Sequence, residues 1–130
     1  MSPMQRTLEY LREIGAVFVK TEYYHHYARR RMDIWSADVM ALHGRQLMAI
    51  QVTDVDHYAE HVTAAIATDS KARNWLRGGV SFYIYAWGKY GARGKRKLWR
   101  VKITQLVLND DGTIEKLTHG YEINNTGDRP

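Results

Sequence analysis

Three polar residues interrupt two otherwise apolar segments of the sequence, and their side chains could support chemistry. Asp38 lies in "ADVMAL", and Gln51 and Thr53 lie in "LMAIQVTD". Together with the residues around them, they suggest a metal-dependent hydrolytic site that is either working or altered. The structural alternative is that polar residues mark the end of a strand, where Asp38 would only cap or turn the chain.

The spacing of the three residues places them together if the chain between them forms a tight hairpin. Gly44-Arg45 fits a two-residue type II′ turn, which prefers glycine at its first position. In that register Asp38 lies directly opposite Gln51, on the same face of the sheet. Thr53 follows two residues later and therefore faces the same side.

The hairpin carries apolar residues on both of its faces, which predicts a central position in a sheet that is covered on two sides. We expect a single α/β (α+β) domain spanning residues 1–130, with a mixed central sheet flanked by helices in the order α-β-β-β-α-β-β. The expected segments are a helix over 3–14 that Ser2 caps, a strand over 16–24, an exposed basic connection over 25–33, hairpin strands over 38–42 and 46–52, a helix over 57–76, and strands over 80–87 and 98–109.

A helix, then strands that carry an Asp and an acid-x-Lys pair, then a helix and more strands, is the element order of the PD-(D/E)XK nuclease superfamily. Over about residues 1–80 this chain resembles that superfamily. Within it, the chain looks most similar to archaeal-type Holliday-junction resolvases and small phage proteins of the same layout. The residues that carry the resemblance are "ADVMALHGRQLMAIQVTD". The resemblance implies a restriction-endonuclease-like fold and an endonuclease that acts on branched or structured DNA.

The resemblance also implies a role for each of the three polar residues. Asp38 matches the metal-binding aspartate, Gln51 takes the place of the second acid, and the Val52 carbonyl is the main-chain ligand. Mg²⁺ or Mn²⁺ would then be held by oxygen atoms. The metal would activate a water for phosphodiester hydrolysis, and Thr53, in place of the family's lysine, would help to orient it. Gln51 brings no negative charge and Thr53 no cation, so metal affinity should be reduced.

Other acids could compensate for these two departures. Resolvases of this type use a glutamate early in the first helix, which aligns near Gln5 here, and Glu9 lies about one turn later. Glu22, Asp33 and Asp54 are the other candidates. With compensation, the chain would be an altered but active nuclease and, by the same resemblance, a homodimer that cuts two strands symmetrically. Without compensation, it would be an inactive DNA-binding protein, such as a phage accessory or inhibitor protein.

Two basic stretches predict contact with a polyanion, in agreement with the net charge of +5, and DNA is the partner that the resemblance implies. The stretch "YYHHYARRR" interleaves tyrosines that could stack on bases with arginines that could grip phosphates. The stretch "KYGARGKRKLWR" could clamp the nucleic-acid backbone. The alternatives are a solvated loop whose tyrosines pack inward and charge that serves only solubility. The candidate nucleic-acid-binding residues are Arg29, Arg30, Arg31, Lys89, Arg93, Lys95, Arg96 and Lys97.

A competing motif is "HYAEH", which matches the H-x-x-E-H pattern of inverted zinc proteases. On a helix His57 and His61 would share a face, with Glu60 beside them and Glu115 or Glu122 as a third zinc ligand. The alternative, which the small size of the chain favours, is a pair of exposed helix histidines near the end of the sheet.

The chain contains no cysteine, which excludes disulfides and thiolate metal sites. Its apolar runs are too short to span a bilayer, and its first residues lack the apolar core of a secretory signal. We therefore expect a cytoplasmic protein, located in the bacterial host cytoplasm if a phage encodes it.

Overall fold

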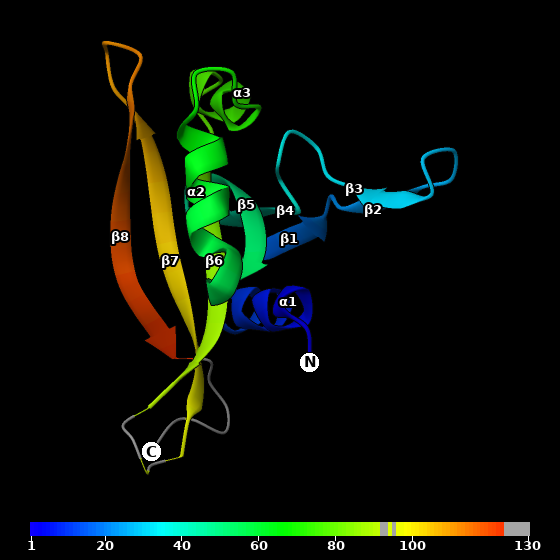
Figure 1. Cartoon of the computed structure of the whole chain (residues 1–130), viewed down its shortest axis with the longest axis vertical. Coiled ribbons are helices and arrows are strands. Elements are labelled where there is room, and N and C mark those ends of the chain that lie inside the picture. Colours follow the sequence, from blue (N-terminus) through cyan, green and yellow to red (C-terminus); the bar gives the residue numbers. More distant parts are fainter. Residues whose placement is uncertain (92–93, 95, 124–130) are drawn as a thin grey trace.

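In the computed structural model, which describes residues 1–91, 94 and 96–123, the chain begins with helix α1 (Pro3–Glu13) (Figure 1). The Ser2 Oγ accepts from the Gln5 N–H at 3.1 Å, and the Gln5 Oε1 accepts from the Ser2 N–H at 2.9 Å. This reciprocal capping box, together with Pro3 at the first helical position, fixes the start of the helix where the sequence predicts it. Gly15, at φ +81°, follows the helix, in a conformation that favours glycine.

Six strands form a mixed sheet in the order β1-β4-β5-β6-β7-β8. β4 pairs antiparallel with both β1 and β5, whereas β5 and β6 run parallel. β7 and β8 extend the sheet by antiparallel pairing. The bounds are β1 (Val17–Lys20), β4 (Val39–His43), β5 (Gln46–Asp54), β6 (Ser81–Tyr90), β7 (Leu98–Leu108) and β8 (Ile114–Ile123). The expectation of a mixed sheet with flanking helices is confirmed, and β8 is a strand that the sequence reading missed.

Helices cover both faces of this sheet (Figure 1). α1 packs through Leu11 against the face that carries Ile50. α2 (Tyr58–Ile66) and α3 (Ala72–Arg77) pack against the face that carries Ala49. Ala49 and Ile50 are neighbours in β5, so their side chains point to opposite faces and each belongs to a separate apolar layer. β5 is therefore central and covered on both sides, as predicted.

The predicted single helix over 57–76 is wrong, because the chain breaks between α2 and α3. Ala67 has an extended ψ of 152°, and the residues that follow it include Thr, Asp and Ser, which compete for backbone hydrogen bonds and disfavour helix. The buried Arg73 closes the break: its Nε donates to the Ala67 carbonyl at 2.8 Å and its Nη2 to the Ile66 carbonyl at 3.2 Å. Its Nη1 donates at 2.6 Å to the carbonyl of Gly112, in the turn between β7 and β8.

The expected basic connection is also wrong in part, because it forms a two-stranded hairpin. β2 (Tyr23–His25) pairs antiparallel with β3 (Arg30–Met32), in a separate two-stranded sheet. This β2–β3 arm projects from the body of the protein (Figure 1). The predicted strand over 16–24 is consequently split into β1 and β2.

The outer end of the sheet is less covered than the sequence predicts. Among the described strands, β4 alone pairs with the edge strand β1, whose Val17 and Val19 side chains are 71% and 60% exposed. Leu42 and Leu47, at the turn of the predicted hairpin, are also exposed. None of the helices in the described part of the chain is both long enough and apolar enough to cross a bilayer.

Candidate functional site

The carboxyl ends of three strands meet at one edge of the sheet. β1 and β5 both run antiparallel to β4, so they point the same way, and β6 runs parallel to β5. The β2–β3 arm follows the end of β1. β6 pairs with β5 as far as Trp87, which lies opposite Asp54. The β6–β7 arm (residues 88–91 and 96–100) continues beyond this last pair. Both basic arms therefore leave the same edge of the twisted sheet and diverge from it (Figure 1).

The predicted hairpin between β4 and β5 forms with the predicted turn. His43 lies opposite Gln46, which leaves Gly44-Arg45 as a two-residue loop. Gly44 has φ +61° whereas Arg45 is not among the residues with positive φ, as a type II′ turn requires. The register continues regularly as far as the pair of Val39 with Ile50.

At Asp38 the regular pairing ends, so the prediction that Asp38 lies directly opposite Gln51 is wrong. The Asp38 N–H donates at 2.8 Å to the carbonyl of Ile50, the residue that already lies opposite Val39. Two residues of one strand thus face one residue of the other, which is the arrangement of a β-bulge. The sequence carries no signal of this extra residue, because the turn alone sets the expected register.

The Asp38 carboxylate takes the place of a main-chain partner at this irregularity. Its Oδ2 accepts from the Val52 N–H at 2.8 Å, and the Asp38 carbonyl accepts from the N–H groups of Thr21 and Glu22 at 2.8 and 3.1 Å. The residue is only 7% exposed. Asp38 therefore ties the start of β4 to β5 and to the segment after β1, which is the capping role that the sequence left open as the alternative.

The environment of Asp38 disfavours its charged form. Burial is the largest cause and raises its pKa from 3.8 to about 7. The hydrogen bond from the Val52 N–H acts in the opposite direction, whereas the nearby carboxylates of Asp33 and Glu22 raise the pKa further. Near neutral pH the group is thus only partly ionised, and a cation that bound it would have to displace the proton.

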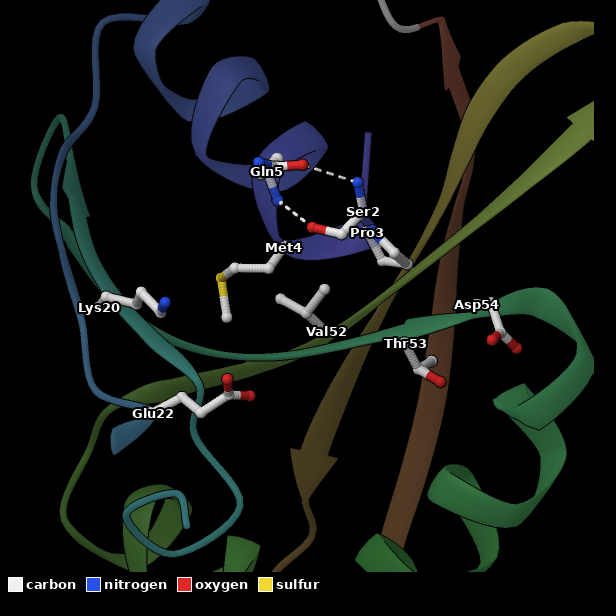
Figure 2. Close-up of a pocket in the computed structure, with 9 residues that line it drawn as sticks. All are labelled: Ser2, Pro3, Met4, Gln5, Lys20, Glu22, Val52, Thr53 and Asp54. Carbon is white, nitrogen blue, oxygen red and sulfur yellow. Dashed lines mark hydrogen bonds between the residues drawn. The ribbon is translucent and has the colours of Figure 1, made fainter. Parts of the chain in front are cut away.

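Neither Gln51 nor Thr53 forms a hydrogen bond with the Asp38 carboxylate, whose partner is the Val52 N–H. By strand alternation they share the face of Ala49, beneath α2 and α3, and Thr53 is buried there. Figure 2 shows Val52 pointing toward Met4 on α1 and Thr53 pointing the other way. The Val52 main chain does lie beside Asp38 as expected, but it meets the carboxylate through its N–H.

A pocket of about 660 Å³ opens at the shared strand edge, between the start of α1 and the ends of β1 and β5 (Figure 2). Four of the predicted site residues line this pocket, namely Glu22, Val52, Thr53 and Asp54, whereas Asp38 does not. The pocket also contains Lys20, a cation that the sequence reading missed because β1 was expected to continue past it. The lining residues are Ser2, Pro3, Met4, Gln5, Lys20, Glu22, Val52, Thr53 and Asp54.

The remaining candidate acids are spread over other sites. Glu9 lines a different hollow along α1, and the Asp33 Oδ1 accepts from the Ser36 N–H at 3.1 Å. The Asp54 Oδ1 caps the short 3₁₀ helix η1 (Val55–His57) by accepting from the His57 N–H at 3.0 Å. Within the described residues, no group of three or more His, Asp or Glu side chains is arranged to hold a metal ion.

One of the two histidines of the competing zinc motif, His57, contacts the Asp54 carboxylate. The His57 Nδ1 lies 2.7 Å from the Asp54 Oδ1, and this contact raises the pKa of His57 above its usual value. His57 precedes the first residue of α2 and forms its N-cap, whereas the zinc hypothesis places it within the helix. Glu122, one of the proposed third ligands, has a side chain outside the described residues.

The two arms carry the predicted cationic residues. Arg29 and Arg30 are exposed in the β2–β3 arm, and Arg31 lies in β3. In the β6–β7 arm Lys89 is exposed, and its Nζ lies 5.4 Å from the ring centre of Trp99. Arg96 and Lys97 are also exposed, whereas Arg93 and Lys95 lie outside the described residues.

Searches of known protein families, curated proteins and solved structures return no match to this chain.

Proposed function

We propose that the protein binds nucleic acid along the sheet edge from which its two arms diverge, and that Asp38 supports the fold there without acting in hydrolysis. The observation that carries this proposal is the common origin of the two arms at one strand edge. A strand of nucleic acid that crosses this edge would meet cations on both sides of the pocket. We also propose the two properties that the resemblance in the sequence implies, a restriction-endonuclease-like fold and a preference for branched DNA.

The charge distribution supports binding to the phosphate backbone. The net charge is +5, and the arms place Arg29, Arg30, Lys89, Arg96 and Lys97 at the surface. Lysine and arginine that neutralise phosphates release condensed counterions, so the affinity should fall steeply as salt is raised. The arms project from the sheet and can therefore approach a duplex or a junction without a clash with the helices.

The test measures the affinity for single-stranded, duplex and four-way-junction DNA by fluorescence anisotropy. The salt concentration is varied from about 50 to about 200 mM, the range over which counterion release weakens the binding of basic proteins to DNA. Lys89→Ala/Lys97→Ala should weaken binding to duplex DNA and reduce the slope of log K against log salt by about 2. The matched control is Arg77→Ala/Lys116→Ala, which removes two exposed cations from the opposite end of the sheet. Equal losses in the two double variants would contradict binding at the arms, and no binding of wild type to any of the three DNAs would end the proposal.

A second candidate function is metal-dependent phosphodiester hydrolysis in the pocket rather than at Asp38. The observation that favours it is that the pocket gathers Lys20, Glu22 and Asp54 beside Val52. Glu22 could hold Mg²⁺ or Mn²⁺ through oxygen and the neighbouring Lys20 could position a nucleophilic water. Asp54 lies on the other side of the pocket, where it caps η1 (Figure 2). The Asp38 carboxylate, first assigned to metal binding, already accepts from the Val52 N–H and has no hydrogen bond with Gln51, so we place hydrolysis in the pocket instead.

Cleavage assays with Mg²⁺, Mn²⁺ or EDTA separate the two candidates. If the pocket hydrolyses DNA, cleavage requires a metal, is lost in Glu22→Gln, and persists in Asp38→Asn. Salt-dependent binding without cleavage under any of these conditions supports the non-hydrolytic function. Cleavage that is abolished by Asp38→Asn in a protein of normal stability would contradict our assignment of Asp38.

A further inference from the structure

The turn between the β2–β3 arm and β4 has an unusual backbone. Ile34 and Ala37 exchange two main-chain hydrogen bonds, of 3.2 and 2.9 Å, around the central residues Trp35 and Ser36. Both central residues have positive φ, +47° and +69°, as in a type I′ turn. Such positions favour glycine or asparagine, and a bulky side chain there is a genuine outlier.

Specific contacts hold Trp35 in this unfavourable conformation. The Trp75 Nε1 on α3 donates to the Trp35 carbonyl at 3.0 Å, and the two indole rings meet edge to face at 5.5 Å. The Asp33 carboxylate accepts from the Ser36 N–H. Trp35 is nevertheless 50% exposed, so full burial of the indole does not account for its presence. Backbone strain that persists with an exposed aromatic ring suggests a functional reason.

The exposed side of Trp35 lines a pocket of about 570 Å³ between the arm and α3. Tyr23 is a second aromatic wall, Arg30 and Lys71 supply two cations, and Asp33 supplies one carboxylate, whose Oδ1 accepts from the Ser36 N–H. Among the residues that the structure describes, none forms an ion pair with Arg30 or Lys71. The pocket therefore combines aromatic surface with positive charge that is available to a ligand.

We propose that this pocket binds one unpaired nucleotide of a nucleic-acid strand, with the base stacked on Trp35 and the phosphate at Arg30 and Lys71. This inference rests on the proposed nucleic-acid binding and names the form of nucleic acid that the protein selects. Aromatic rings stack on any base, and cations bind the adjoining phosphate. A base inside a regular duplex cannot reach the ring, so single strands and the unpaired bases of branched or distorted DNA are the ligands.

The decisive variant is Trp35→Asn, which removes the ring but keeps the turn. Asparagine tolerates positive φ better than tryptophan, so the fold should be retained, as a thermal unfolding curve will show. We expect the affinity for a single-stranded dT oligonucleotide to fall about tenfold or more, the range for loss of one stacked base. The affinity for a duplex of the same length should stay within about twofold, because backbone contacts there do not use the ring.

Two further variants define the pocket. Lys71→Ala should weaken single-strand binding and leave the unfolding midpoint unchanged, because Lys71 is exposed. Tyr27→Ala is the matched aromatic control: Tyr27 is 97% exposed on the same arm but does not line the pocket. It should retain single-strand affinity, and an equal loss in Tyr27→Ala and Trp35→Asn would overturn the assignment to this pocket.

The outcomes also separate this inference from the function on which it rests. Wild-type protein that binds duplex DNA in a salt-dependent way, with single-strand affinity unchanged in Trp35→Asn, overturns the nucleotide pocket alone. Wild-type protein that binds neither single-stranded nor duplex DNA overturns both proposals. Quenching of tryptophan fluorescence by the dT oligonucleotide that is reduced in Trp35→Asn would support the stacked base directly.

Discussion

Replacement of Asp38 by asparagine tests whether this residue supports the fold or binds a metal. Asparagine has nearly the same shape, and its Oδ1 can accept the hydrogen bond that the Val52 N–H now donates to the carboxylate. The substitution therefore removes the ability to ionise and replaces one carboxyl oxygen by an NH₂ group, while the hydrogen bond from Val52 can be kept. We expect Asp38→Asn to be more stable than wild type at pH 8 and to lose this advantage as the pH falls.

The magnitude follows from the pKa of the buried carboxyl. Because folding raises the Asp38 pKa from 3.8 to about 7, the folded protein retains a proton that the unfolded chain releases between these two values. The contribution of Asp38 to stability is thus fully present below the lower value and is lost as the pH rises through the upper one. The slope is about 1.4 kcal/mol per pH unit, and the whole change is about 4 kcal/mol.

The assay is urea unfolding followed by circular dichroism at several pH values from 4 to 8, on wild type and Asp38→Asn in parallel. Distant titrating groups, such as the Asp54–His57 pair, contribute equally to both proteins and cancel in the difference, whereas Asp33 and Glu22 interact with Asp38 and belong to the measured effect. The difference in unfolding free energy should shift progressively in favour of Asp38→Asn with rising pH. Parallel curves for the two proteins would refute the claim that burial controls this carboxyl.

Addition of Mg²⁺ to the same measurement tests metal binding directly. A ligand that binds only the folded state stabilises it in proportion to RT ln(1 + [L]/Kd). We expect Mg²⁺ to stabilise wild type and Asp38→Asn equally or not at all. Stabilisation of wild type alone at pH 8 would show that Asp38 holds the cation, and the hydrolytic assignment of this residue would return.

Three further changes test other parts of the structure. Gly88→Ala places a Cβ about 2.6 Å from the Val55 side chain and should lower the unfolding free energy by about 1–3 kcal/mol in urea unfolding. Asp54→Asn should lower the pKa of His57, the opposite of the present shift, and NMR titration of the imidazole will show whether it does. Ser2→Ala removes the cap of α1 and should lower the free energy of unfolding by about 1 kcal/mol. An unchanged midpoint of thermal unfolding would contradict this expectation.

Local signals in the sequence were sufficient for the elements that depend on neighbouring residues. Ser2, Pro3 and Gln5 determine the start of α1 through contacts within one turn of helix. Gly44 determines the β4–β5 turn and most of its register, since a two-residue loop leaves little freedom in the pairing. The apolar stretch that became β6 was recognised for the same reason, because its pattern needs no distant partner to identify it.

Features that depend on distant residues were missed. The helix after η1 breaks because Arg73 reaches back to carbonyl groups of α2 and across to Gly112, and no local pattern reports that contact. The bulge at Asp38 depends on how the segment after β1 bonds to it, through Thr21 and Glu22. The predicted pair of Asp38 and Gln51 therefore does not form, because one extra residue lies opposite Ile50 at this point.

The three hydrogen bonds of Arg73 have a mechanical consequence for the whole molecule. One guanidinium joins the end of α2, the start of α3 and the tip of the long β7–β8 hairpin, at the end of the sheet opposite the β6–β7 arm (Figure 1). We expect a load on the β6–β7 arm to pass along β7 to this junction, where the hydrogen bonds of Arg73 share it with the two helices.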